Sequence, residues 1–385
     1  TTSTTGRDIT ATEGDVSFGA FAYANSSASA KASVSGTEAA KDDSETSEKQ
    51  ASEQLTASDD TANKDKNQDA IKGQAKTSQG NVSVAAGLAL NVINSSAKAT
   101  LADGRTINSA GKFKLATANE TDGAAIADGS AVGSTGTTVG IGVGVALNIV
   151  SANNEATIGV ATVTAKGIEL EAKMSQALGG DGYSDFKAEA TAGAGATKVG
   201  VAGAFALNAV GTNPSIAAIK GGAVVDAGGG DVTAIAENNT KSKTIANAVQ
   251  VASDPKNPPK VGVGVAFALD KITNRAEAGL QDNVTLTNGG KLTLTATSDN
   301  SSETSVTTGS AGNISVSPSV ALNIVSNATI ASIGTGSLLT VKSVEASATH
   351  KGSTTASADG AAAGGKVGLG AALSFNFVND TTTST

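Results

Sequence analysis

Large apolar residues alternate with small ones along a short phrase of this chain. In the copy VGIGVGVALN at 139–148, one parity carries Val, Ile, Val, Val and Leu, and the other carries Gly, Gly, Gly and Ala. A period of two indicates a β-strand, and β-branched residues favour that conformation. We predict that the Val/Ile/Leu parity faces the core. On that assignment Val145→Asp should be severely destabilising, because it would bury an unpaired charge.

The glycines of the other parity need a reason, since glycine weakens a strand. Close approach of a second layer of backbone, or packing between filaments, would supply one. The alternative is that small residues merely suit a flat surface.

The phrase recurs seven times at nearly constant spacing. The copies occupy 16–25, 82–91, 139–148, 199–208, 261–270, 314–323 and 367–376. They close on Asn25, Asn91, Asn148, Asn208, Asp270, Asn323 and Asn376. Successive closing residues are 53–66 residues apart, which is typical of a repeat protein in which each unit packs on its neighbours.

The closing Asn or Asp has a structural interpretation. Both residue types tolerate left-handed backbone and bond their own backbone at turns. Where the same turn recurs in stacked coils, Asn side chains can also hydrogen-bond to one another in a ladder. We therefore predict seven structural turn positions, with a ladder or with isolated turns as the two alternatives.

Three β architectures fit many short strands: a sandwich, a barrel and a parallel β-helix. Units of this size with few large residues could not each build a core, whereas stacked coils share one. We predict an all-β fold, a right-handed parallel β-helix forming one solenoid over 1–385. Seven repeats of two coils each would give an axis of roughly 60 Å at ~4.8 Å per coil.

Two segments interrupt the repeats. Residues 41–72 are rich in charged residues and almost lack large apolar ones, which predicts a solvated, peripheral insertion or loop. Residues 254–260 contain three prolines and predict a rigid loop.

Composition excludes several functions. The chain has no Cys and one His, His350, so thiol chemistry, Cys-ligated metal sites and metal sites with two His ligands are excluded. A net charge of −8 with three Arg argues against nucleic-acid binding. No apolar stretch is long enough for a membrane helix, and we expect no cofactor, no metal and no catalytic residue. Residues 179–185 (GGDGYSD) faintly resemble a calcium loop but lack its full ligand spacing, and a plain turn is the alternative.

The stretch VALNIVSANNEATIG followed by VTAKGIELEA resembles the repeat of very large leukotoxin-type filamentous adhesins and related haemagglutinin-like secreted proteins of Gram-negative bacteria. The resemblance covers most of 82–350, and its second half is carried by Ala156, Ile158, Gly159, Val163, Ala165, Gly167, Ile168, Leu170 and Ala172. It implies a long extracellular fibre at the bacterial surface that serves attachment.

Three functions stay open at this point. The first is a structural or adhesive fibre segment, whose partners would be other copies of itself or the continuation of the same chain. The second is a carbohydrate-active β-helix enzyme, which would need charged residues gathered on one coil face. The third, an ice-binding solenoid, needs a Thr array in every coil, which other units break with Glu169 or Lys112. Both ends are short Thr/Ser runs, so we expect a fibre segment with uncapped coils.

Overall fold

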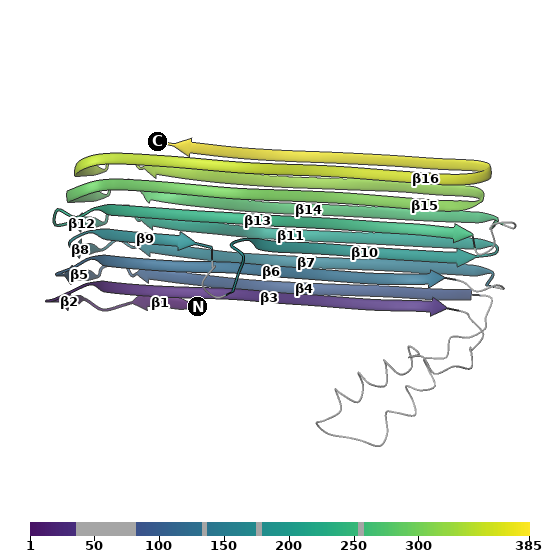
Figure 1. Cartoon of the computed structure of the whole chain (residues 1–385), viewed down its shortest axis with the longest axis horizontal. Helices are drawn as coiled ribbons and strands as arrows, with labels where there is room; N and C mark the ends of the chain where they lie inside the picture. Colours follow the sequence, from purple (N-terminus) through teal and green to yellow (C-terminus); the bar gives the residue numbers. More distant parts are fainter. Residues whose placement is uncertain (36–81, 133–136, 175–178, 253–257) are drawn as a thin grey trace, which may run out of the picture.

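The computed structural model describes residues 1–35, 82–132, 137–174, 179–252 and 258–385. All regular structure in these residues is β-strand, joined in one large sheet whose strand pairs are parallel (Figure 1). The prediction of an all-β chain with parallel stacked strands is confirmed. The charged insertion at 41–72 and most of the loop at 254–260 lie outside the described residues, so both stay predictions.

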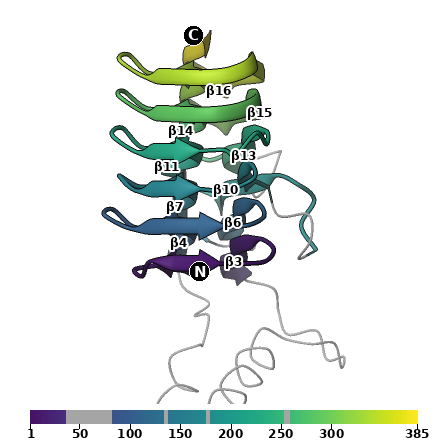
Figure 2. The ribbon, with the colours of Figure 1, turned by 90° about the vertical axis from the view of Figure 1, so that its left-hand side faces the viewer.

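The sheet folds into two long walls and a narrow corner, which Figure 2 shows from the end of the strands. Wall A contains β1 (Thr2–Thr5), β4 (Val82–Leu101), β7 (Val139–Ile158), β11 (Val199–Ile219), β14 (Val261–Leu280) and the later parts of β15 (Thr285–Ile333) and β16 (Leu338–Ser384). Wall B contains β3 (Val16–Ser35), β6 (Phe113–Val132), β9 (Ile168–Lys173), β10 (Ser184–Ala196), β13 (Val232–Ala252) and the middle of β15 and earlier part of β16. The corner contains β2 (Ile9–Ala11), β5 (Thr106–Ser109), β8 (Thr162–Thr164), β12 (Val224–Asp226) and the first residues of β15 and β16.

Each repeat forms one coil. Val139 of β7 pairs with Val199 of β11, which pairs in turn with Val261 of β14. Equivalent residues of successive repeats are therefore direct neighbours in the sheet. The expectation of two coils per repeat is therefore wrong. The seven strands of wall A span about 30 Å at ~4.8 Å per strand, which is about half of the axis length expected from two coils. Long coils make the molecule a blade, longer along its strands than along its stack (Figure 1).

The first copy of the phrase does not belong to the same column as the others. Its strand, β3, lies in wall B and pairs with β6, so that Asn25 stands beside Asp122. The other six copies align in wall A. The resemblance of 16–25 to the phrase reflects a similar alternation of residues and not an equivalent place in the coil.

The predicted inward face is wrong. In β7 the Gly/Ala parity is buried, whereas Val143 is 36% exposed and Val145 and Leu147 are half-buried. The same holds in β14, where Ala266 and Ala268 are buried and Val265 is 43% exposed. Val145 thus points away from the interior, and the severe destabilisation expected for Val145→Asp loses its basis.

The distance between the walls explains the inversion. A Cβ atom built on Gly142 of wall A would overlap the carbonyl oxygen of Gly193 of wall B, and one on Gly140 would overlap that of Gly195. The two backbones approach so closely here that no side chain fits at these two positions, and along this end of β4, β7, β11, β14 and β15 the inward residues of wall A are all Gly, Ala or Ser. Of the reasons considered for the Gly parity, close approach of a second layer is the one that the structure shows.

The other end of the coil is wider and holds the large apolar residues. There the corner strands separate the walls, and buried side chains stack in columns along the solenoid. One column comes from each side of this end: Leu101, Ile158, Ile219 and Leu280 from wall A, Ile107, Val163, Val225 and Leu286 from the corner, and Phe113, Ile168, Val232 and Leu292 from wall B. The core is therefore a wedge, apolar and thick at the corner and lined mostly by small residues, Ala, Gly and Ser, at the thin end.

The thin end gives a matched pair of substitutions. Gly142→Ala should lower the free energy of unfolding by roughly 1–3 kcal/mol, since neither facing backbone can yield to the added methyl group. Gly203→Ala adds the same atom on the outer side of β11, where nothing lies within 4 Å, and should be neutral or stabilise the strand by up to about 1 kcal/mol. Denaturant unfolding of both variants measures the difference, and equal effects would contradict the close approach.

Candidate functional site

The predicted Asn and Asp positions lie within strands and not at turns. Asn148 sits in the middle of β7 with its side chain fully buried, and Asn208 and Asp270 occupy the same place in β11 and β14. Asn91, Asn323 and Asn376 belong to the same column. Asn25, by contrast, lies in wall B with its side chain outward and exposed. The turn assignment was wrong because these residues end the recurring phrase without ending the strand.

Hydrogen bonds join the first three residues of this column, Asn91, Asn148 and Asn208, into a ladder. Asn91 Nδ2 donates to Asn148 Oδ1 at 2.9 Å, and Asn148 Nδ2 donates to Asn208 Oδ1 at 3.0 Å. The same amides also bond across the interior, since Asn148 Nδ2 donates to the Gly123 carbonyl of wall B at 3.1 Å. An amide carries both a donor and an acceptor, so each copy can satisfy its neighbours above and below. Of the two alternatives, the ladder is the one that forms.

A second ladder of hydrogen-bonded Asn and Asp side chains was not predicted from the sequence. Asn213 Nδ2 donates to Asn274 Oδ1 at 3.2 Å, Asn274 Nδ2 to Asn327 Oδ1 at 3.0 Å, and Asn327 Nδ2 to Asp380 Oδ1 at 2.7 Å. The sequence does contain a signal for this ladder: in three copies of the repeat, an Asn or Asp follows four residues after the closing Asn or Asp of the phrase. A bulge just before Asn213 shifted the spacing in the fourth.

Asp270 interrupts the first ladder with a carboxyl group. It has no exposed surface, and its Oδ2 accepts hydrogen bonds from Ser242 Oγ and Ser302 Oγ, each at 2.7 Å. Its Oδ1 has no partner among the described residues. Burial raises the pKa of Asp270 to about 7, against the lowering effect of the two serine hydroxyls. The ladder therefore contains one group that titrates near neutral pH.

This pKa makes the stability of the fold depend on pH. The folded state favours protonated Asp270, whereas the unfolded chain loses that proton near pH 4. The free energy of unfolding should therefore fall by about 4 kcal/mol between pH 4 and pH 8. Asp270→Asn keeps the shape, removes the charge and should flatten this dependence. Unfolding at several pH values tests it, with Asp359→Asn at an exposed position as the control. An unchanged slope in Asp270→Asn would contradict it.

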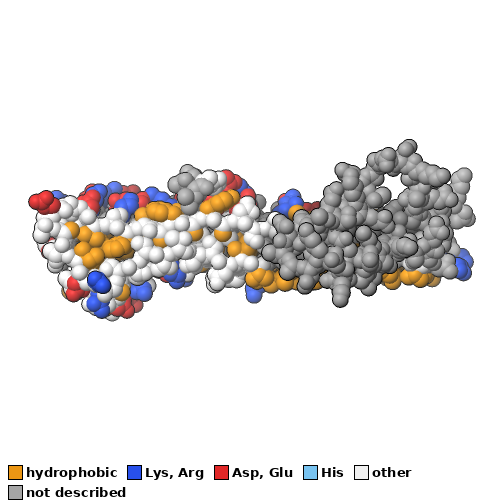
Figure 3. All heavy atoms as spheres, turned by 90° about the horizontal axis from the view of Figure 1, so that it is seen from below, with side chains coloured by type: hydrophobic (Ala, Val, Ile, Leu, Met, Phe, Trp, Pro, Cys, Tyr) orange, Lys and Arg blue, Asp and Glu red, His pale blue; other side chains and the backbone are white. Residues whose placement is uncertain are grey.

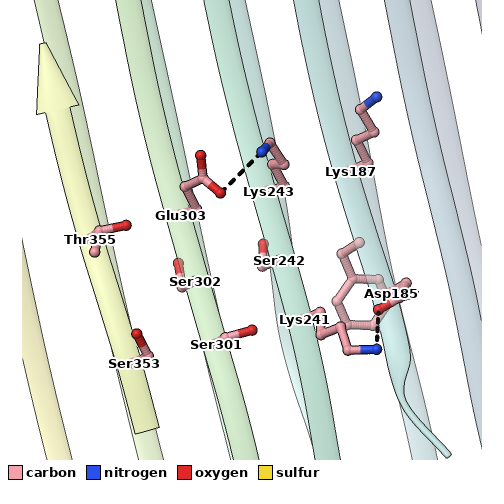
Figure 4. A pocket seen from close by; sticks show the side chains of 11 residues that line it. Asp185, Lys187, Lys241, Ser242, Lys243, Ser301, Ser302, Glu303, Ser353 and Thr355 are labelled. Carbon is pink, nitrogen blue, oxygen red and sulfur yellow. Dashed lines mark hydrogen bonds and ion pairs between the residues drawn. The ribbon is translucent and has the colours of Figure 1, made fainter.

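The outer side of wall B carries a polar groove of about 460 Å³, which crosses the strands (Figure 4). Its two rims are rows of outward side chains, one starting at Asp185 and Lys241 and the other at Lys187 and Lys243. Lys243 Nζ lies 3.0 Å from Glu303 Oε2, and Lys241 Nζ lies 3.9 Å from Asp185 Oδ1. Because successive coils stack, the groove runs along the solenoid axis.

An aromatic and charged cluster borders this groove. Lys241 Nζ stands 3.8 Å from the ring centre of Tyr183, whose hydroxyl donates to Asp299 Oδ2 at 3.1 Å. Lys351 Nζ contacts the same Asp299 oxygen at 2.9 Å. Burial raises the pKa of Asp185, which the nearby Lys241 partly opposes. The sequence signal for this cluster was weak, because its residues come from four repeats and share no motif.

The contacts of Asp181 distinguish between the calcium loop and the plain turn considered for residues 179–185. Its Oδ1 accepts the Tyr183 backbone N–H at 2.9 Å, and its Oδ2 lies 3.2 Å from Lys241 Nζ. A carboxylate capping its own turn and paired with lysine fits the plain turn. Among the described residues, no group of three or more His, Cys, Asp or Glu side chains could hold a metal ion.

The single histidine takes part in a Ser–His–Asp arrangement. His350 Nδ1 is 2.7 Å from Ser298 Oγ, and His350 Nε2 is 3.6 Å from Asp380 Oδ2. Ser298 is buried inside the solenoid, and its hydroxyl also contacts Thr329 Oγ1 at 2.6 Å. A nucleophile must reach substrate, whereas this hydroxyl faces the polar interior. The arrangement continues the internal hydrogen-bond network and offers no open nucleophile.

Comparison with known proteins adds no identification: no protein-family model, no curated protein and no solved structure matches the chain. The part of the chain that the structure describes also contains no helix long and apolar enough to cross a membrane.

Proposed function

We propose that this chain is a segment of an extracellular fibre at a bacterial surface, a right-handed solenoid of about seven repeats that serves attachment or contact between cells. The observation that supports the proposal is the in-register stacking of the repeats, from Val82 of β4 to the end of β16. Such a stack lengthens by one strand spacing per repeat and keeps its cross-section, which suits a fibre. The resemblance of 139–172 to filamentous adhesins points the same way.

The polar groove of wall B supports the adhesive part of the proposal. It offers lysines and carboxylates along the axis, and its lining comes from four successive coils. A polar ligand lying along the axis would meet hydrogen-bonding groups at each of these four coils. In this proposal the partner is an extended polar molecule of a host surface or matrix, bound by many weak contacts.

Attachment can be measured directly. Non-adherent bacterial cells that display the chain should bind matrix-coated or cell-covered surfaces several-fold better than cells that display nothing. The double variant Lys241→Glu and Lys243→Glu should reduce this gain, because it reverses the charge of the groove. Thr307→Glu, which adds a negative charge on the outer side of wall B away from the groove lining, is the control. Equal attachment with and without the displayed chain would overturn the proposal.

A carbohydrate-active enzyme is the second candidate, because charged residues do gather on one coil face. Glycosidases need two carboxyl groups across the scissile bond, one of them with a raised pKa. Asp185 has such a pKa, and Glu303 is the other carboxylate of the groove. Release of reducing ends from a panel of polysaccharides, abolished by Asp185→Asn, would favour this candidate over the fibre.

A further inference from the structure

The outer side of wall A is a large apolar surface. Six strands contribute six outward positions each: β4 from Val82, β7 from Val139, β11 from Val199, β14 from Val261, β15 from Ile314 and β16 from Val367. Of these thirty-six positions, the only polar or charged one is Lys271. The rest are Val, Leu, Ile, Phe and Ala with one Gly and one Pro. We call this array the apolar face.

The apolar side chains of this face are open to solvent in the single chain. In the end strands β4 and β16, Leu88 is 64% exposed and Phe377 58%, and in the central strands Ile149 is 42% exposed and Val265 43%. In the middle of the face the rings of Phe205 and Phe267 stack at 5.5 Å between centroids. In the view along the stack, hydrophobic side chains appear along part of one long edge of the molecule (Figure 3).

The apolar face is about as large as the surface that one partner buries in a stable protein–protein complex. Six strands at ~4.8 Å and six outward positions at ~6.8 Å cover roughly 1,000 Å². Monomeric proteins rarely expose apolar patches above ~300–600 Å². A stable complex buries about 800 Å² on each partner. The apolar face alone therefore meets the requirement of a specific protein interface.

Its border has the composition of a protein interface. Beyond the apolar positions, the same strands carry ion pairs of both signs, Lys98 with Glu155 and Arg275 with Glu277. An apolar centre with a polar rim is the usual anatomy of protein contacts. A surface that lies on anionic lipid would instead have an excess of Lys and Arg around it.

We propose that the apolar face binds the apolar face of a second copy of this chain. Two flat sheets with the same spacing of strands and side chains can pack face to face at about 10 Å, as the layers of a β-sandwich do. A two-fold axis through the face would bring identical patches together and leave both polar grooves on the outside. The product is a double blade with charged outer surfaces.

Sedimentation velocity at rising concentration tests the proposal. The chain should be dimeric at micromolar concentration, and Val265→Lys near the centre of the face should weaken the dimer at least tenfold. Thr307→Lys places the same charge at an exposed outward position of wall B and should leave association unchanged. Circular dichroism should show that both variants keep the fold. Weakening by Thr307→Lys alone would assign association to another surface and overturn the proposal.

Cysteine labelling gives a second measurement without an added charge, since the chain has no native Cys. Val265→Cys should react slowly with a maleimide at high protein concentration and quickly on dilution, whereas Thr307→Cys should react quickly throughout. Slow labelling of a monomer would mean that another segment of this chain covers the face. Fast labelling of a monomer, slowed only by phosphatidylcholine vesicles, would mean a lipid surface. Either result overturns the proposal.

Discussion

Parallel strands in register place every residue directly above and below its counterpart in the next coil, and the rest of this structure depends on that constraint. A side chain that points inward must tolerate a copy of itself one strand spacing away. Leucine and isoleucine meet this condition at the wide end by forming apolar columns. Asparagine meets it in the middle of wall A, because its amide donates to one neighbour and accepts from the other. A carboxylate does not, which is why Asp270 requires two serines and a raised pKa.

The short distance between the two walls also determines which residues lie on the outer surface. At the thin end wall A carries only Gly, Ala and Ser on its inner side, and the large apolar residues of the alternating phrase project outward. Wall B shows that an apolar exterior is not a general requirement of the fold, because its outer side carries ion pairs such as Lys243 with Glu303. The two walls therefore solve the same packing problem inside and present different chemistry outside.

The strand period, the repeat and the parallel stacking could all be predicted from the sequence, because each leaves a local pattern. The inward face could not, since the usual rule assigns Val and Leu to the core, and the distance between walls is a property of the whole coil. The number of coils per repeat was missed because nothing in the phrase marks the length of a wall. Asn148 was recognised as structural but placed at a turn. The polar groove brings together Asp185, Lys243 and Glu303, whose proximity only the stacking reveals.

Large length differences between repeats lie at a junction between walls and at one break inside wall B, where twelve positions separate Ala172 of β9 from Ser184 of β10 and four separate their sheet partners Ala236 and Thr240. Twelve positions separate Val249 from Val261, whereas five separate their sheet partners Gly309 and Ile314. Extra residues between the end of β13 and the start of β14 leave the paired columns on either side in alignment. The same residues added to the middle of β7 without such a break in the strand would displace every inward amide and methyl group after them. Repeats of unequal length can therefore stack at a uniform width, provided that their extra residues lie between paired columns and not within them.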